Sequence, residues 1–252
     1  MEQRDRFFSS KNTVSHLSEE TASQTQDYLK VVQAFARLTY QSVYVIDYEK
    51  KAFDFVSDNP LFLCGLSSDE VKEMGYDFYF KYVDPQDLAL LITINEAGFD
   101  FYEKLPVNER IDYTISYDFQ LVNENRNRVL VNHKLTPLFL NDDGKIWKAM
   151  CVVSLSHQQH SGNITVSRQN SETIHVFDPE RKIWHKDQRI ALTARETDIL
   201  CLYARGFTIA QIAERLFISP DTVKFHRKKL FDKIGVDNIT EAMSYATHHR
   251  LF

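Results

Sequence analysis

Three lysines and a phenylalanine near the C-terminus are spaced so that they fall on one side of a helix. They are Lys224, Phe225, Lys228 and Lys229. At about 100° per residue, Leu230 and Ile234 fall within ~20° of Val223, and these three residues define the opposite, buried face. Lysine ammonium groups bind phosphate oxygens or base edges, and an aromatic ring contacts the methyl group of thymine. A basic helix face of this kind is suited to contact with nucleic acid.

Each residue on or beside this face has an alternative role. Lys224 and Lys228 could contact phosphates alone, which would position the protein without specifying a sequence. Phe225 cannot hydrogen-bond, so it either meets a thymine methyl group or packs sideways on a neighbouring helix. His226 and Arg227 lie about 60° and about 40° from the buried centre, which favours packing of the imidazole and of the arginine stem.

No residue pattern indicates catalysis or a metal site. Nine histidines and 35 carboxylates are present, but none shows ligand spacing. HExxH, GxSxG and Gly-rich phosphate-binding loops are all missing. We therefore expect no enzymatic activity, no metal and no resident cofactor. The three cysteines, Cys64, Cys151 and Cys201, form no CxxC pair and are predicted to be core thiols in a reducing compartment.

Capping signals predict four helices around the basic face. Residues suited to begin a helix stand three positions before Glu or Gln, or directly before a proline: Thr193, Thr208, Asn238 and Ser219. Glycines end the first and third helices. The predicted helices are 193–205, 208–216, 219–234 and 238–248. Only Phe217 and Ile218 separate the second helix from the third, which predicts a helix-turn-helix with the basic face on the groove-entering helix.

The same segment resembles the LuxR-type (GerE-like) helix-turn-helix family over about residues 188–250. The resemblance rests on Leu192-Thr-Ala-Arg-Glu196, Ile199-Leu200, Ala204-Arg-Gly206, Ile212-Ala-Glu-Arg-Leu216, Ile218-Ser219, Thr222-Val-Lys-Phe-His226 and Lys233-Ile-Gly-Val236. So many spaced matches in one short segment make a chance resemblance improbable.

This resemblance implies a role for each matching position. The residues implied to read bases are Lys224, Phe225 and Lys228. The residues implied to contact the DNA backbone are Ser219, Thr222, Lys229 and Lys233. The last helix is implied to form a dimer contact through Asn238, Ala242 and Met243. The alternative for Ala242 and Met243 is packing within the domain's own core.

Residues 23–157 show a different order of elements. Apolar spacing predicts a helix from about Ser23 to Tyr40, and short helices are expected within Ser67–Gly98. The strand-like runs are Ser42–Tyr48, Ala52–Ser57, Tyr113–Val122, Val129–Pro137 and Lys148–Ser156, with turns at Asn123–Asn127 and Asn141–Gly144. Strands, then helices, then three long strands form an α+β order with an antiparallel sheet.

About residues 25–157 resemble the PAS sensory fold. The stretches that carry the resemblance are Val45-Ile-Asp47, Phe53-Asp-Phe55, Ser57-Asp-Asn59, Gly65, Ser68-Asp-Glu70, Asp84-Pro-Gln-Asp87, Leu121, Leu130-Val-Asn132, Asp143-Gly144 and Cys151-Val-Val-Ser154. The resemblance implies a five-stranded sheet curled around an interior that can hold a small molecule. It does not identify that molecule.

Charge divides the chain into two parts. The net charge is −5, but residues 189–252 hold ten Lys/Arg against seven Asp/Glu and are net basic. The predicted domains are a flexible arm (1–22), the PAS-like sensor (23–157), a linker with a coupling hairpin that pairs 163–167 with 173–178 (158–188), and the helix-turn-helix domain (189–252). The longest apolar run, near Leu88–Ile94, is far short of a bilayer span, and the start lacks a signal peptide, so we expect a cytoplasmic protein.

The sequence therefore predicts an α+β PAS-like sensor domain followed by an all-α, four-helix LuxR-type domain. The hypothesis is a dimeric, sequence-specific transcription regulator that responds to a signal. Its expected partners are double-stranded DNA, a second copy of the chain and RNA polymerase, with no membrane contact. The alternatives are a response regulator with a receiver domain, a sigma-like promoter subunit and a signalling adaptor that does not bind DNA.

Overall fold

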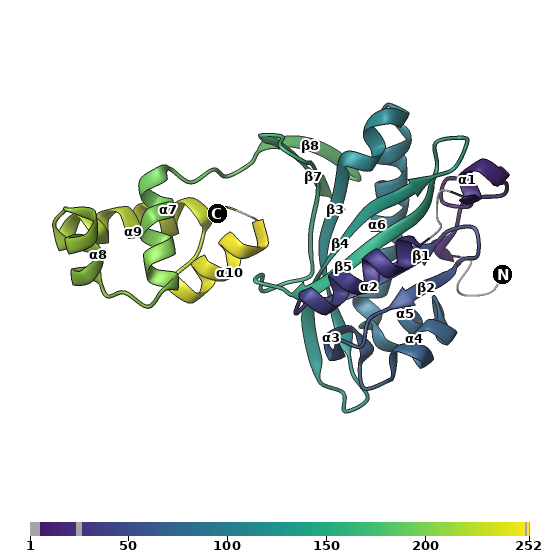
Figure 1. Cartoon of the computed structure of the whole chain (residues 1–252), viewed down its shortest axis with the longest axis horizontal. Helices are drawn as coiled ribbons and strands as arrows, with labels where there is room; N and C mark the ends of the chain where they lie inside the picture. Colours follow the sequence, from purple (N-terminus) through teal and green to yellow (C-terminus); the bar gives the residue numbers. More distant parts are fainter. Residues whose placement is uncertain (1–5, 24–26, 250, 252) are drawn as a thin grey trace. The chain divides into compact units, whose positions relative to one another are not determined.

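The computed structural model describes residues 6–23, 27–249 and 251. The chain divides into two compact units, residues 1–187 and residues 188–252. In Figure 1 the first runs from purple to green and the second from green to yellow. Each unit has apolar clusters of its own, so each is described by itself.

The first unit contains one eight-stranded sheet in the order β2-β1-β5-β4-β3-β6-β7-β8. Its strands are β1 (Ser42–Asp47), β2 (Ala52–Val56), β3 (Tyr113–Val122), β4 (Arg128–Leu140), β5 (Ile146–Leu155), β6 (Gly162–Arg168), β7 (Thr173–Asp178) and β8 (Ile183–Gln188). Each neighbouring pair from β2 to β7 is antiparallel. A receiver domain needs a parallel sheet, so the response-regulator alternative is contradicted.

The five predicted strands correspond to β1–β5, which are neighbours in the sheet as the PAS resemblance implies, but β6, β7 and β8 extend the sheet beyond the five strands expected. Both predicted turns are present: Asn123–Asn127 joins β3 to β4, and Asn141–Gly144 joins β4 to β5. Gly144 has a φ of +74°, and a Cβ atom there would lie 2.7 Å from Cγ1 of Val107. The second turn therefore requires glycine for both its backbone and its packing.

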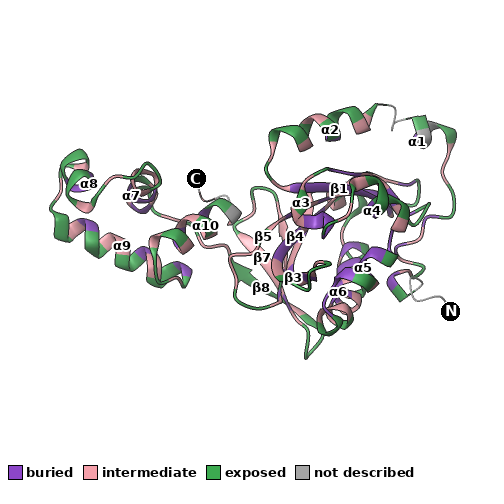
Figure 2. Ribbon diagram, turned by 90° about the horizontal axis from the view of Figure 1, so that it is seen from below, coloured by how far each residue is buried: buried purple, intermediate pink, exposed green. Residues whose placement is uncertain are grey.

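Helices cover both faces of this sheet. The first unit holds α1 (Glu19–Ser23), α2 (Tyr28–Leu38), α3 (Pro60–Leu63), α4 (Ser68–Met74), α5 (Asp77–Tyr82), α6 (Pro85–Glu103) and the 3-10 helix η2 (Val107–Asp112). Alternate residues of β1 pack on opposite sides: Tyr44 and Ile46 join the main core, whereas Val43 and Val45 pack with Val32 of α2. Figure 2 shows α2 on one side of β1 and α5 and α6 on the other.

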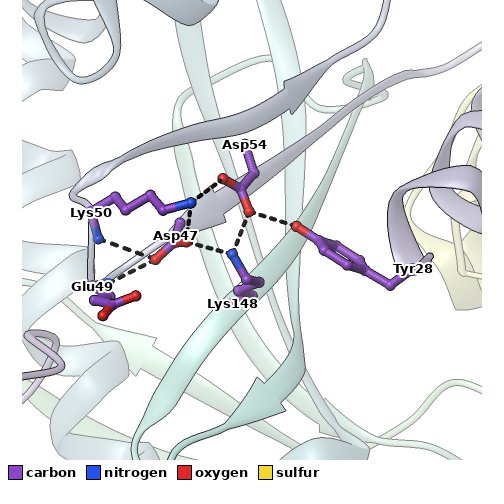
Figure 3. A network of polar contacts seen from close by, with 6 residues as sticks. All are labelled: Tyr28, Asp47, Glu49, Lys50, Asp54 and Lys148. Atoms are coloured by element: carbon purple, nitrogen blue, oxygen red, sulfur yellow. Dashed lines mark hydrogen bonds and ion pairs between the residues drawn. The ribbon is translucent and has the colours of Figure 1, made fainter. Parts of the chain in front are cut away.

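A buried ionic network fixes α2 to the sheet (Figure 3). The Lys148 side chain on β5 is 4% exposed, and its ammonium group donates to the carboxylates of Asp47 and Asp54. The Tyr28 hydroxyl of α2 donates to Oδ2 of Asp54 over 2.7 Å, while Lys50 approaches the same two carboxylates from the loop. Burial, followed by the bond to Asp54, raises the pKa of Tyr28. Because the buried charges satisfy one another, the network holds α2 in one position.

The prediction of a flexible arm over residues 1–22 is wrong for its described part, residues 6–22. Phe7 and Val14 are 5% and 4% exposed, and the amide of Asn12 donates to the Phe7 carbonyl over 2.6 Å. The Phe7 ring lies 5.6 Å from the ring centres of both Tyr76 and Tyr79. The few apolar side chains have no helical period, yet they bury well, because packing depends on their location in space and not on their spacing. Residues 1–5 of the predicted arm lie outside the described residues.

Of the predicted linker and hairpin over residues 158–188, only the hairpin is confirmed. β6 and β7 pair through Thr165↔Val176, Val166↔His175 and Ser167↔Ile174. However, β6 also pairs with β3 and continues the main sheet, with Ile164 and Val166 in its core. The physical reason is that β3 would otherwise leave an open edge, which an adjacent alternating strand can pair with.

The second unit consists of α7 (Ala194–Ala204), α8 (Ile209–Leu216), α9 (Pro220–Ile234) and α10 (Ile239–His249). Each lies within about one residue of its predicted range. The predicted capping boxes of Thr193 with Glu196 and of Thr208 with Gln211 are both formed. Local capping chemistry thus determines where these helices begin.

Membrane-spanning helices and the state of the cysteines are the last two features of the fold. None of the described helices combines the length and the hydropathy needed to cross a bilayer. All three cysteines are free thiols; Cys64 and Cys151 are buried and Cys201 is half-buried. Burial raises the pKa of the Cys64 thiol to about 12, which keeps it protonated and unreactive.

Candidate nucleic-acid interface

A two-residue turn joins α8 to α9, as predicted. Phe217 ends α8 in the left-handed conformation with a φ of 53°, and the Ile218 N–H donates to the Ala213 carbonyl over 3.0 Å. Ser219 then caps α9, because its Oγ accepts the Thr222 N–H over 3.1 Å. The short turn fixes α9 against α8 and produces the helix-turn-helix.

The two faces of α9 are those predicted from the sequence. Val223 and Leu230 are fully buried and Ile234 is 6% exposed. Val223 packs with Ile199 of α7 and Ile212 of α8. The residues of the opposite face are all exposed: Asp221, Lys224, Phe225, Lys228, Lys229 and Asp232. Packing of the buried face of α9 thus turns its opposite face, with three lysines and one aromatic ring, towards solvent.

Phe225 is 64% exposed, which contradicts its alternative role in packing on a neighbouring helix. Its ring contacts only the edge of the adjacent His226 among the ring contacts of the described residues. Single exposed apolar side chains are ordinary on protein surfaces, so the informative feature is that Phe225 lies between Lys224 and Lys228 on the same exposed face of the helix. It is therefore placed to contact an apolar group of a ligand.

Lys224 forms an exposed ion pair at the start of α9. Its Nζ lies 3.0 Å from Oδ1 of Asp221, which is 89% exposed. An exposed pair of this type contributes little to stability. Lys224 can therefore exchange this carboxylate for a phosphate or a base edge.

Ser219 and Thr222 lie together where α9 begins. Their hydroxyl oxygens are 2.8 Å apart and hydrogen-bonded. Pro220 has no N–H, and the N–H groups of Thr222 and Val223 are already bonded to Ser219, so the hydroxyls rather than the backbone would meet a ligand here. This arrangement suits contact with a phosphate oxygen, although Ser219 also has the structural role of a helix cap.

Lys233 is engaged in a structural contact that the sequence reasoning missed. Its Nζ lies 3.1 Å from Oε2 of Glu196, whose side chain is 1% exposed. Burial alone would raise the pKa of Glu196, but the hydrogen bonds from Thr193 and Lys233 bring that pKa below its usual value. Lys233 neutralises a buried carboxylate, which weakens the implied role as a phosphate contact. No local signal reveals the pair, since 37 positions separate its members.

The three residues implied to form a dimer contact are in different environments. Ala242 is fully buried among Leu200, Leu230 and Ala246, so its implied dimer contact is wrong and the core alternative holds. Met243 is partly buried against the same cluster. Asn238 is exposed, and its Oδ1 accepts the Glu241 N–H over 3.0 Å as the predicted cap of α10.

His226 and Arg227 are half-buried, in line with their expected packing. Nη1 of Arg227 lies 3.5 Å from the Tyr203 hydroxyl, and its guanidinium group lies 5.9 Å from the centre of the Phe231 ring. The stem of Arg227 thus runs along the domain, as predicted.

The interior of the first unit contains a polar chain that the sequence did not reveal. The Tyr44 hydroxyl is hydrogen-bonded to the Tyr79 hydroxyl and to Nε2 of His133. Burial lowers the pKa of His133 to about 3, so its ring is neutral at pH 7. A cavity of about 30 Å³, enough for about one water molecule, lies nearby. Its lining includes Ile94, Asn95, Gly98, Phe99, Tyr102 and Tyr117.

Comparison with known proteins identifies the second unit. Residues 191–246 match the family described as "Bacterial regulatory proteins, luxR family". The C-terminal unit is therefore a LuxR-type helix-turn-helix domain. The chain shares 52% identity over 58 residues with the probable transcriptional regulatory protein SgaR of Hyphomicrobium methylovorum, covering 23% of this chain and 26% of SgaR.

Two further similarities extend beyond this domain. The chain is 30% identical over 106 residues to the oxygen regulatory protein NreC of Staphylococcus aureus, covering 42% of this chain and 45% of NreC. The chain thus spans less than half the length of these curated relatives. A solved structure of the Vibrio cholerae VqmA dimer is similar over 88% of both chains, at 18% identity and a TM-score of 0.36.

Proposed function

We propose that the protein is a sequence-specific DNA-binding transcription regulator that acts as a dimer under the control of its first unit. The observation that carries the proposal is the exposed face of α9, where Lys224, Phe225 and Lys228 point away from the core of their own domain. In a helix-turn-helix, this face of the second helix lies in the major groove. Kinship of the second unit with bacterial regulators supports the same function.

Each residue of the face has a proposed contact. Lys224 and Lys228 donate to acceptor atoms on base edges, for which guanine O6 and N7 are the usual partners. Phe225 packs against a thymine methyl group. Ser219, Thr222 and Lys229 bind phosphates and set the register of the protein on the duplex. We exclude Lys233 from this set because Glu196 holds it.

The small size of one helix-turn-helix domain is the reason to propose a dimer. A single small module buries limited surface on DNA and binds weakly, whereas two copies on a two-fold site combine their contacts. We place the contact between copies on the exposed side of α10, with Asn238 and Met243 at its border. RNA polymerase is the partner through which such a protein, located in the cytoplasm, would alter transcription.

The first unit is proposed to sense a signal. A molecule that binds one conformation of this unit more tightly than another would shift the population between them and change the spacing of the two reading helices. The ligand is unidentified, and the small cavity beside Tyr102 and Tyr117 implies that a larger ligand would have to displace side chains. Native mass spectrometry of the purified protein would reveal a retained small molecule.

Selection from a pool of random double-stranded DNA tests the proposed function. We expect enrichment of a two-fold motif with thymine in each half-site. The matched control is the full-length Lys224→Ala/Lys228→Ala variant, which should enrich no motif while remaining folded. Failure of the wild-type chain to enrich any sequence at low salt would favour the non-binding adaptor.

A further inference from the structure

Two arginines in the second unit lie over one aromatic ring, at the corner between α7 and α8. The guanidinium carbon of Arg215 is 4.1 Å from the centre of the Phe207 ring, and that of Arg205 is 5.1 Å from it. Phe207 is half-buried and packs in the same apolar cluster as Ile212 and Val223. Val223 belongs to α9, the helix proposed to enter the major groove. Packing of the Phe207 ring in this cluster therefore fixes both arginines relative to α9.

Both guanidinium groups are available for a ligand. Arg205 and Arg215 are not buried, and within the described part of the chain no carboxylate lies at ion-pair distance from either. Stacking uses the flat face of a guanidinium group and leaves its N–H donors in the plane free. Both guanidinium carbons lie within 5.1 Å of the same ring centre, so the ring holds both charges at this corner of the domain.

We propose that Arg205 and Arg215, held by Phe207, bind phosphate groups of the DNA backbone beside the groove that α9 enters. The inference rests on the proposed function and adds a contact outside α9. In a helix-turn-helix the first helix crosses the sugar–phosphate backbone while the second enters the groove. Arg215 lies on that first helix, α8, and Arg205 directly precedes the turn that leads to it.

A phosphate fits this pair better than an acidic protein surface does. Guanidinium groups form two parallel hydrogen bonds with phosphates and with carboxylates alike, but only the successive phosphates of one strand offer a regular row of such acceptors. The pair also shares a packed cluster with the helix that would occupy the adjacent groove. An acidic protein surface is the competing partner, and the experiment separates the two.

The test measures DNA affinity as a function of salt with the full-length chain. Fluorescence anisotropy on the selected duplex and on a random duplex, between about 50 mM and about 200 mM salt, gives the slope of log K against log salt. In the Arg205→Gln/Arg215→Gln variant the slope should decrease in magnitude by about 0.9 for every phosphate that the variant no longer neutralises. The decrease should be the same on both duplexes, because phosphates carry no sequence information.

Two further variants sharpen the result. Arg181→Gln removes an exposed arginine from the first unit, where the side chain is 78% exposed, and should leave the slope unchanged. Phe207→Leu retains both charges but removes the aromatic stack, so it should weaken binding less than the double variant does. Circular dichroism should show that all three variants are folded.

The outcomes separate the two proposals. A wild-type chain that binds no duplex even at low salt would defeat the proposed function and this inference together. A wild-type chain that binds, with an unchanged slope in the double variant, would defeat the inference alone. If the double variant also failed to bind an acidic protein that the wild type binds, the unchanged slope would assign the arginine pair to that other class of partner.

Discussion

The Nζ atom of Lys233 lies 3.1 Å from Oε2 of Glu196, a carboxylate whose side chain is only 1% exposed. This contact joins the last turn of α9 to the first turn of α7. It therefore links the helix that faces the proposed DNA to the helix that opens the domain. The family resemblance implies a DNA phosphate contact for Lys233. In the structure its ammonium group instead neutralises the buried carboxylate of Glu196.

Replacing this lysine should destabilise the second unit. In Lys233→Met, Glu196 would remain buried without its cation, which should lower the free energy of unfolding by about 1–3 kcal/mol, since Lys233 is itself one-third exposed. Chemical denaturation followed by circular dichroism measures the change. The matched control is Lys229→Met on the same helix, at an exposed position, which should leave stability unchanged and weaken DNA binding. Equal stability of the two variants would contradict the structural role of Lys233.

The contact of Phe225 can be tested by removing a single methyl group from the DNA. Replacing the contacted thymine by uracil should weaken wild-type binding by about 1 kcal/mol, or about fivefold in Kd. The Phe225→Ala variant should bind thymine and uracil duplexes equally, because it has no ring to meet the methyl group. A variant that retained the wild-type preference for thymine would show that Phe225 does not make this contact.

Lys228 and Lys229 are adjacent but should behave differently. Lys228→Ala should cost about 1–3 kcal/mol on the selected site and much less on random DNA, because the variant can no longer donate to a base. Lys229→Ala should weaken binding to both duplexes alike and reduce the salt dependence. Competition assays measure, for each variant, the ratio of its affinity for the selected duplex to its affinity for the random duplex. An equal loss of affinity on both duplexes for Lys228→Ala would reassign this residue to the phosphates.

The helices of the second unit were predictable because their signals are local. Thr193 and Glu196 stand three residues apart and form the predicted capping box. The angular positions of Val223 and Leu230 likewise depend only on helical geometry, and both residues are buried as expected. The basic face of α9 followed directly from these two kinds of signal.

Contacts between distant positions were not predictable in the same way. The pairing of β6 with β3 depends on which sheet edge is free, and strand alternation carries no information about that. The burial of Phe7 depends on its packing against the rings of Tyr76 and Tyr79, which lie about 70 positions further along the chain. The pair of arginines on Phe207 arises only when α8 brings Arg215 back towards the preceding turn.

The buried histidine of the first unit should make stability depend on pH. Burial lowers the pKa of His133 to about 3 in the folded state, against about 6.5 in the unfolded chain. Between these values the unfolded chain binds a proton that the folded chain excludes. The stabilisation is therefore complete above about pH 6.5 and is lost as the pH falls towards 3, by up to about 1.4 kcal/mol per pH unit.

Urea unfolding of the wild type and of His133→Phe measures this effect. The stability of the wild type relative to the variant should fall by about 2 kcal/mol between about pH 7 and about pH 5. In this variant the bond between Tyr44 and Tyr79 remains, and the loss of the bond to His133 costs the same at every pH in this range, so it does not enter the comparison between pH values. The control is His160→Gln, at an exposed position between β5 and β6. Its free energy of unfolding should change with pH in parallel with that of the wild type. Parallel curves for His133→Phe as well would show that His133 takes up its proton without unfolding the interior.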